Sequence, residues 1–281
     1  LIFQYTVQAG DNDANGISVS GNLDLNGGTV RDAAGNDLAL TLNGVGTTSG
    51  VIVDTVRPTA TIVVANNALS VGETSLVTIT FSEAVTGLEL SDFSVEHGAL
   101  SNLTSRDGGI TWTATLAPTV GITNTGNVIT LNNAGYADAA GNAGRGTTDS
   151  NHYAIDTQRP MATIVVADTA LAVGETSTVT ITFSEAVSGL TTADFSIKHG
   201  VLSNLSSNDG DLTWTATLTP TAGITDTSNV ITLDNTGYVD AAGNVGSGTT
   251  DSNNYAIDTQ RPTATIVVAD TALAVGETST V

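Results

Sequence analysis

The chain has 281 residues, with 28 Asp plus Glu against 7 Lys plus Arg and a formal net charge of −21. Such a surface repels phosphate backbones and anionic lipids, so we expect no nucleic-acid binding. No stretch approaches the ~18 consecutive apolar residues of a membrane-spanning helix, and we expect no membrane insertion in this segment. A composition of 40% hydrophobic and 12% charged residues argues against disorder. Since there is no Cys, a secreted protein of this kind would depend on packing or metal rather than on disulfides.

The sequence repeats itself at an interval of 102 residues. Segments 57–158 and 159–260 align without a gap and differ at 26 of 102 positions. Near-identical copies add length or valency, whereas an active site needs only one copy, so a structural or binding role is favoured. We predict four segments: the C-terminal part of a related domain at 1–56, complete domains at 57–158 and 159–260, and the truncated start of another at 261–281.

Strand patterns dominate each segment. The first segment has short apolar runs at 17–19 and 50–53, which predict two strands. In the complete domains, apolar residues such as Val179, Ile181 and Phe183 alternate with Thr, as in half-buried strands. Seven strands are predicted in the second complete domain, near 163–167, 178–184, 194–198, 201–206, 212–219, 229–239 and 253–258, with the same set 102 residues earlier. Their spacing is typical of an all-β antiparallel sandwich. The short linker Asp156–Pro160, stiffened by Pro, favours an elongated string of such domains.

Strand parity places acidic residues from separate loops at one end of each domain. In a seven-strand sandwich, the loop after the second strand (the B–C loop) and the loop before the last strand (the F–G loop) lie at the same end as the incoming linker. The first complete domain therefore gathers Asp54, Glu83, Asp138 and Asn142. The second gathers Asp156, Glu185, Asp240 and Asn244. A turn in the first segment carries Asp11 and Asp13, which should face Asp54.

Clusters of carboxylate and amide oxygens are suited to Ca²⁺, which takes 6–8 oxygen ligands in flexible geometry. Zinc is disfavoured, because the chain has no Cys and its three His residues are dispersed. Two alternatives stay open. The Asp-Ala-Ala-Gly-Asn segments that contain Asp138 and Asp240 could be turns alone, and Glu83 and Glu185 could be solvated loop residues.

The order of motifs resembles the bacterial Ig-like repeats of giant surface adhesins, including biofilm-associated and RTX-type adhesins. The motifs are Asp-Thr-x-Arg-Pro, Gly-Glu-Thr, Thr-Phe-Ser-Glu-Ala-Val, Asp-Phe-Ser, Leu-Ser-Asn-Leu, Thr-Trp-Thr-Ala-Thr-Leu and Asp-Ala-Ala-Gly-Asn. The resemblance implies tandem Ig-like antiparallel β-sandwiches in an extender region that Ca²⁺ stiffens. It also implies that interdomain calcium is held by a linker Asp and loop carboxylates, which map onto Asp54, Asp138, Asp156 and Asp240.

The leading functional hypothesis is a non-catalytic stalk of an adhesin on the bacterial cell surface, in an extracellular location. Its partners would be the neighbouring repeats of the same chain, with a host or surface receptor bound by other domains. The alternative is that the repeats themselves bind a glycan, a host protein or ice. An enzyme is disfavoured, because no Ser-His-Asp arrangement, Gly-rich phosphate loop or metal-binding His pair is present.

Overall fold

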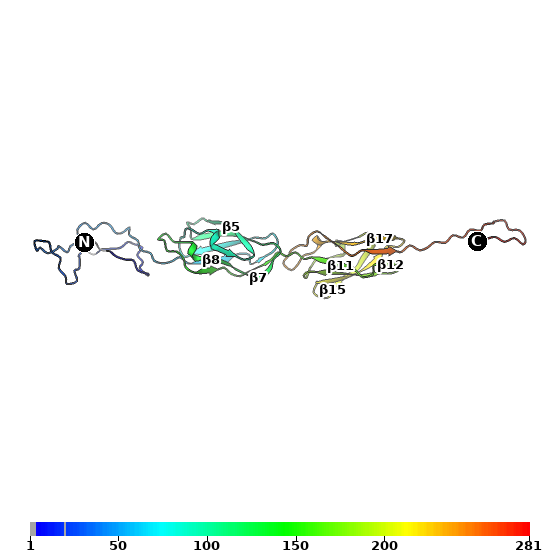
Figure 1. Cartoon of the computed structure of the whole chain (residues 1–281), viewed down its shortest axis with the longest axis horizontal. Helices are drawn as coiled ribbons and strands as arrows, with labels where there is room; N and C mark the ends of the chain where they lie inside the picture. Colours follow the sequence, from blue (N-terminus) through cyan, green and yellow to red (C-terminus); the bar gives the residue numbers. More distant parts are fainter. Residues whose placement is uncertain (1–3, 20) are drawn as a thin grey trace. The chain divides into compact units, whose positions relative to one another are not determined.

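The computed structural model describes residues 4–19 and 21–281, and the chain divides into two compact units, Leu1–Ile155 and Asp156–Val281. Each unit contains one β-sandwich, so the predicted all-β class with tandem sandwiches is confirmed (Figure 1). The described residues contain no helix with the length and apolar character needed to cross a bilayer.

The two sandwiches are built from equivalent strands. The first contains β1 (Ala60–Val64), β2 (Ala68–Leu69), β3 (Ser75–Phe81), β4 (Phe93–Val95), β5 (Gly98–Ser105), β6 (Thr111–Pro118), β7 (Thr123–Asn127), β8 (Ile129–Asn132), β9 (Thr147–Asp149) and β10 (Tyr153–Asp156). The second contains β11 (Ala162–Val166), β12 (Ala170–Ala172), β13 (Ser177–Phe183), β14 (Phe195–Ile197), β15 (Gly200–Ser207), β16 (Thr213–Pro220), β17 (Thr225–Asn229), β18 (Ile231–Asp234), β19 (Thr249–Asp251) and β20 (Tyr255–Asp258). Short 3₁₀ turns precede β4 and β14 and follow β8 and β18.

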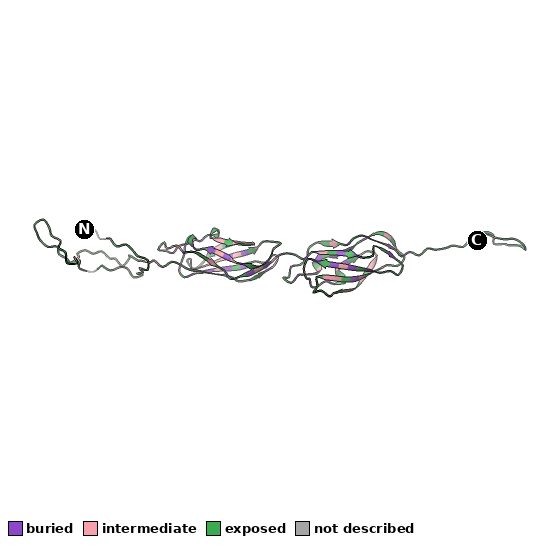
Figure 2. Cartoon of the chain, turned by 60° about the horizontal axis from the view of Figure 1, so that its bottom comes forward, coloured by how far each residue is buried: buried purple, intermediate pink, exposed green. Residues whose placement is uncertain are grey.

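Each sandwich has a four-stranded antiparallel sheet and two three-stranded sheets. In the second sandwich the orders are β11-β13-β16-β15, β12-β20-β17 and β14-β18-β19. The core draws apolar side chains from all three sheets, among them Val179, Leu171 and Leu233. On β13, Val179, Ile181 and Phe183 are buried while Thr178 and Thr182 are exposed, as the alternation predicted. Buried residues lie along the strands of both sandwiches, and residues 261–281 are largely exposed (Figure 2).

Three short strands of each sandwich were not predicted. In the second sandwich they are β12, β17 and β19. Strands β17 and β19 read Thr-Asp-Thr-Ser-Asn and Thr-Thr-Asp, so they lack the apolar alternation on which a sequence prediction depends. The pairing of β12 with β20 is parallel, which departs from the predicted antiparallel arrangement.

The first segment forms isolated bridges in place of the strands predicted at 17–19 and 50–53. Asp13 bridges to Val53, and the amide of Ile17 donates to the carbonyl of Val51 over 3.2 Å. No named strand begins before Ala60 in the described residues. Val51 is 47% exposed and Ile52 is 64% exposed. The side chains of these apolar runs are therefore not covered by a sheet or a hydrophobic core.

Four tyrosines are fully buried in the cores, and none of their hydroxyl groups bonds to a protein group in the described chain: Tyr136, Tyr153, Tyr238 and Tyr255. Burial raises the pKa of Tyr238 to about 12, against an ordinary value of about 10. Folding therefore favours the neutral phenol. The contribution is fully present below pH ~10, and the free energy of unfolding should fall by about 3 kcal/mol as pH rises from about 10 to 12.

We expect Tyr238→Phe to reduce this alkaline loss. At neutral pH it should leave the unfolding free energy unchanged or higher, because a buried hydroxyl without a partner costs about 1–3 kcal/mol. Urea unfolding of both proteins between pH 7 and 11.5 measures the difference. An alkaline loss as large in Tyr238→Phe as in the parent chain would contradict the prediction.

Candidate metal centre

The three carboxylates predicted at the incoming linker of each sandwich lie close together. One oxygen from each of Asp54, Glu83 and Asp138 lies within 4.8 Å of the others. Asp156, Glu185 and Asp240 form the equivalent group within the same limit. We call these the first and second acidic triads. In both, the F–G loop residue is buried and the other two are half-buried.

The core positions the two loops of each triad. The ring of Phe183, at the end of β13, packs edge-on against Tyr238 with ring centroids 4.7 Å apart. Just beyond these rings, the amide of Ser188 donates to the carbonyl of Val239 over 2.8 Å. Glu185 and Asp240 each lie two residues after a member of the aromatic pair, so they emerge at the same end of the sandwich. Phe81 and Tyr136 make the same contact in the first sandwich, with centroids 4.6 Å apart.

The Asp-Ala-Ala-Gly-Asn turn holds its own Asp side chain. Oδ1 of Asp240 accepts from the amides of Ala242 and Asn244, both at 2.8 Å, and Oδ2 accepts from Nδ2 of Asn244 at 2.9 Å. Gly243 has φ of 88°, a left-handed conformation that favours Gly. Asp32 in the first segment makes the same set of bonds but belongs to no triad. Local bonds are therefore sufficient for the turn, and the triad is an additional feature.

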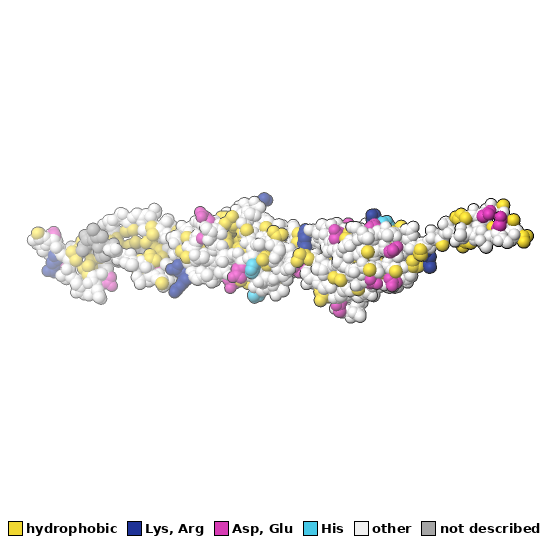
Figure 3. Space-filling model, turned by 45° about the vertical axis from the view of Figure 1, so that its right-hand side comes forward, with side chains coloured by type: hydrophobic (Ala, Val, Ile, Leu, Met, Phe, Trp, Pro, Cys, Tyr) yellow, Lys and Arg dark blue, Asp and Glu magenta, His cyan; other side chains and the backbone are white. Residues whose placement is uncertain are grey.

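Like charges act on the carboxyls of each triad. Burial, with the charges of Asp240 and Asp156, raises the pKa of Glu185, and burial with Asp138 and Asp54 raises the pKa of Glu83. Burial also opposes ionisation of Asp138, but hydrogen bonds from the side chain and backbone of Asn142 and from nearby amides outweigh it and lower its pKa. Acidic side chains are spread over both sandwiches on the face drawn in Figure 3.

Asn142 and Asn244, predicted as neutral oxygen ligands, connect the turn to the linker. Nδ2 of Asn142 donates to the carbonyl of Asp54 at 3.0 Å and to Oδ2 of Asp138 at 2.8 Å. Nδ2 of Asn244 donates to the carbonyl of Asp156 at 2.8 Å. A role of their amide oxygens as ligands stays a prediction.

Sequence reasoning missed two arginines beside the triads. Nη1 of Arg57 donates to the carbonyl of Ala143 at 2.6 Å, and Arg159 makes the same bond to Val245. Both arginines belong to the linkers and both carbonyls to the F–G loops. The available signal was the recurrence of Arg in the Asp-Thr-x-Arg-Pro motif.

Asp11 and Asp13 lie outside the first acidic triad. Oδ2 of Asp11 accepts from the hydroxyl of Tyr5 at 2.6 Å, and Oδ1 of Asp13 accepts from the amide of Asn15 at 3.1 Å. This turn bonds to the linker through its backbone rather than through its carboxylates. The carbonyl of Asp11 accepts a hydrogen bond from Oγ1 of Thr55 at 2.9 Å.

The donor set of each triad fits a hard divalent cation. Two oxygens bound to one Ca²⁺ at 2.3–2.6 Å are at most about 5 Å apart, and the triad oxygens, which all lie within 4.8 Å of one another, satisfy this limit. Three carboxylates supply only part of the usual 6–8 ligands, so backbone carbonyls, amide oxygens and water would complete the sphere.

The chain is similar to solved structures of the Escherichia coli adhesin FdeC (16% identity, 78% of this chain and 70% of that chain, TM-score 0.34) and the Yersinia pseudotuberculosis adhesin InvE (16%, 69% and 58%, TM-score 0.26). It is also similar to the tandem Ig repeats of Dlar (12%, 72% and 98%, TM-score 0.24). No curated protein gave a significant match.

The sequence profile of the bacterial Ig-like domain matches the chain twice, at residues 54–155 and 156–257. Each match begins at the linker Asp of one triad and covers one sandwich up to the penultimate residue of its last strand. Together the two matches cover more than half of the chain. The chain therefore belongs to the family of bacterial Ig-like domains.

Proposed function

We propose that this chain is part of the non-catalytic extender of a bacterial adhesin, exported to the cell surface, where it supports adhesion or biofilm formation. Membership of the bacterial Ig-like family supports the proposal. So does the tandem repetition, because 102-residue copies that differ at only 26 positions multiply length rather than chemistry. A terminal adhesive domain would be held away from the cell by such a segment.

The observation that carries the proposal is the recurrence of the acidic triad. Each triad combines one linker residue, Asp54 or Asp156, with carboxylates from the two loops of the sandwich that follows in sequence. We propose that Ca²⁺ is held by these carboxylates, with oxygens of Asn142 and Asn244 as further candidates. A bound ion would neutralise the charges that raise the pKa of Glu83 and Glu185, and it would restrain the linker against the loops.

The positions of the two tryptophans favour an extender function rather than a sugar-binding function. Trp112 and Trp214 are half-buried and pack against the cores. Nε1 of Trp214 donates to the carbonyl of Asp211 at 3.2 Å. Because the indole rings pack against the cores, little of their flat surface is accessible for stacking on a sugar.

Small-angle scattering and calorimetry of the chain with Ca²⁺ or with chelator test the proposal. We expect Ca²⁺ to increase the maximum particle dimension and to raise the melting temperature, because it removes repulsion at the linkers. Added K⁺ at equal ionic strength is the control for general screening. Superimposable scattering profiles with Ca²⁺ and chelator would contradict the proposed stiffening.

A further inference from the structure

The backbone carbonyls of the incoming linker of the second sandwich accept hydrogen bonds from the F–G loop. Nδ2 of Asn244 donates to the carbonyls of Asp156 at 2.8 Å and Gln158 at 3.3 Å. Arg159 donates in turn to the carbonyl of Val245. Asn244 is 2% exposed, so its bonds are partly shielded from water, whereas the Arg159 bond is exposed. The first sandwich holds its incoming linker by the equivalent bonds from Asn142 and Arg57.

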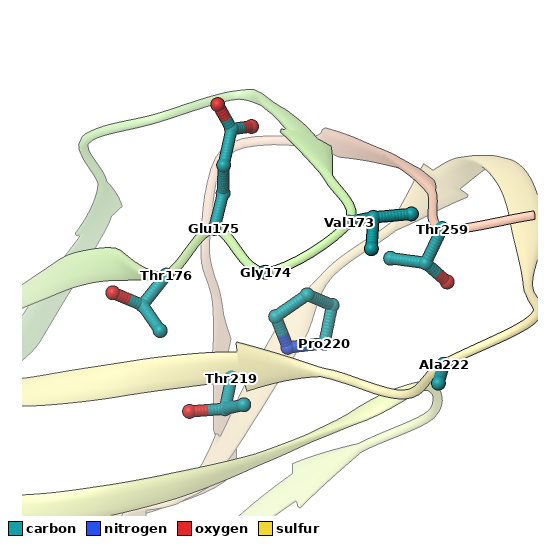
Figure 4. Close-up of a pocket in the computed structure, with 8 residues that line it drawn as sticks. All are labelled: Val173, Gly174, Glu175, Thr176, Thr219, Pro220, Ala222 and Thr259. Atoms are coloured by element: carbon teal, nitrogen blue, oxygen red, sulfur yellow. The ribbon is translucent and has the colours of Figure 1, made fainter. Parts of the chain in front are cut away.

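The outgoing linker of the same sandwich is held by a different residue, Thr259. Its amide donates to the carbonyl of Ile224 at 2.8 Å, and its Oγ1 accepts from the amide of Ile224 at 3.0 Å. The same hydroxyl donates to the carbonyl of Thr221 at 2.7 Å. Figure 4 shows Thr259 beside Val173 and near Ala222 at this end of the sandwich. Thr259 is only 6% exposed. It is therefore packed against the turn before β17 and belongs structurally to the sandwich.

One linker shows both kinds of bond together. At Asp54–Pro58, Oγ1 of Thr55 accepts from the amide of Gly10 and donates to the carbonyl of Asp11, both at 2.9 Å. The carbonyl of Asp54 and the guanidinium of Arg57 are bonded to the F–G loop of the sandwich that follows. Within one motif, Thr is bonded to the segment before the linker, and Asp and Arg to the domain after it.

We infer that Asp-Thr-x-Arg-Pro is a hydrogen-bonded splint that orders the linker without a metal ion. Thr fixes the motif to the turn before it, while Arg and the Asn of the F–G loop fix it to the domain after it. The ring of Pro then fixes the φ angle of Pro itself at the end of the motif. The motif recurs at 156–160 as Asp-Thr-Gln-Arg-Pro. The splint goes beyond the proposed function, because its hydrogen bonds use no calcium ligand atom of the triads.

The splint has a consequence for any ion bound at a triad. Ordering one residue's backbone costs roughly 1–2 kcal/mol. If hydrogen bonds already order the linker, a cation that binds to the triad does not have to supply this free energy. The binding site is then preorganised. A linker ordered only by the ion would instead lose its order in chelator. Since order parameters report only ps–ns motion, Ca²⁺ stiffening of a linker ordered in this way would act on slower motions.

Backbone ¹⁵N relaxation of the full chain in chelator tests the inference at residues 55–57, where the bonds of Thr55 are seen. We expect order parameters of about 0.85, as in rigid backbone, where a free linker gives less than about 0.6. Thr55→Val removes the hydroxyl at nearly constant shape and should lower these values. Thr55→Ser should leave them unchanged, because it keeps the hydroxyl that bonds to Gly10 and Asp11. Thr178→Val, at an exposed position on β13, is the matched control and should change nothing at the linker.

Two results would overturn the splint. One is a linker that is mobile in chelator and becomes ordered only when Ca²⁺ is added, which would leave the proposed calcium-dependent extender intact. The other is an ordered linker that Thr55→Val does not alter. Absence of calcium binding, by contrast, would end the proposed stiffening and leave the splint standing, so the two failures are distinguishable.

Discussion

Replacing Glu83 and Glu185 together by Gln is expected to stabilise the metal-free protein and to weaken Ca²⁺ binding. In the folded state burial and neighbouring carboxylates raise the pKa of both groups, so their charged forms are disfavoured there. Neutral Gln removes that penalty when no ion is bound. It also removes one of three charges from each triad, and we expect the dissociation constant to rise about tenfold to a hundredfold.

The opposite signs of the two effects make this variant informative. Titration calorimetry measures the affinity, and thermal unfolding in chelator measures the stability. The matched control is Glu73→Gln with Glu175→Gln. These carboxylates accept bonds from the amides of Ser70 and Ala172 in turns outside the triads. Equal loss of calcium affinity in the two double variants would show that general acidity, rather than the triads, binds the ion.

Gly144→Ala is expected to destabilise the first sandwich by about 2–3 kcal/mol, because overpacking forces backbone or ring to move. A Cβ at this position would lie 2.4 Å from the carbonyl oxygen of Asn133 and 2.8 Å from Cζ of Tyr136. Neither group can move freely, because Asn133 and Tyr136 are buried. Gly144 also follows Asn142 and Ala143 directly, so a shift there would move the F–G loop and weaken calcium binding at the first triad.

The first sandwich offers its own control for this substitution. A Cβ at Gly126 meets only Oδ1 of Asn124, at 3.9 Å, and the second sandwich has Ser228 at the corresponding position. Gly126→Ala should therefore leave the unfolding free energy nearly unchanged. Chemical denaturation of both variants gives the comparison. A loss in Gly126→Ala as large as in Gly144→Ala would mean that the tight space at Gly144 is not the cause.

The sequence alone was sufficient to predict the fold class. It was also sufficient to predict that the three carboxylates of each triad lie close together. Alternation of Val179, Ile181 and Phe183 with Thr marks a strand with one buried face, and strand parity then decides at which end each loop lies. That reasoning needs no side-chain geometry. It therefore placed Glu185 with Asp240, although they are far apart in sequence, without knowledge of the Phe183–Tyr238 pair that fixes them.

Bonds from side chains to backbone carbonyls could not be predicted in the same way. The hydropathy pattern contains no signal for the bonds of Arg159 and Thr259. Only the repetition of the motif indicates that these residues have a role. The same limit applies to β17, whose polar sequence pairs through its backbone with β20. The turn with Asp11 was expected to face Asp54, and its carbonyl does accept a bond from Thr55, the next residue. The carboxylate of Asp11 accepts from Tyr5 and Gln8, and its role as a metal ligand stays a prediction.

A crystal structure of the chain grown with Ca²⁺ tests the central claim most directly. Anomalous scattering should place one ion in each triad, within about 2.3–2.6 Å of oxygens of all three carboxylates. For the second triad these oxygens belong to Asp156, Glu185 and Asp240. Fully ordered side chains with only water between them, at calcium concentrations that alter scattering or stability, would contradict the account.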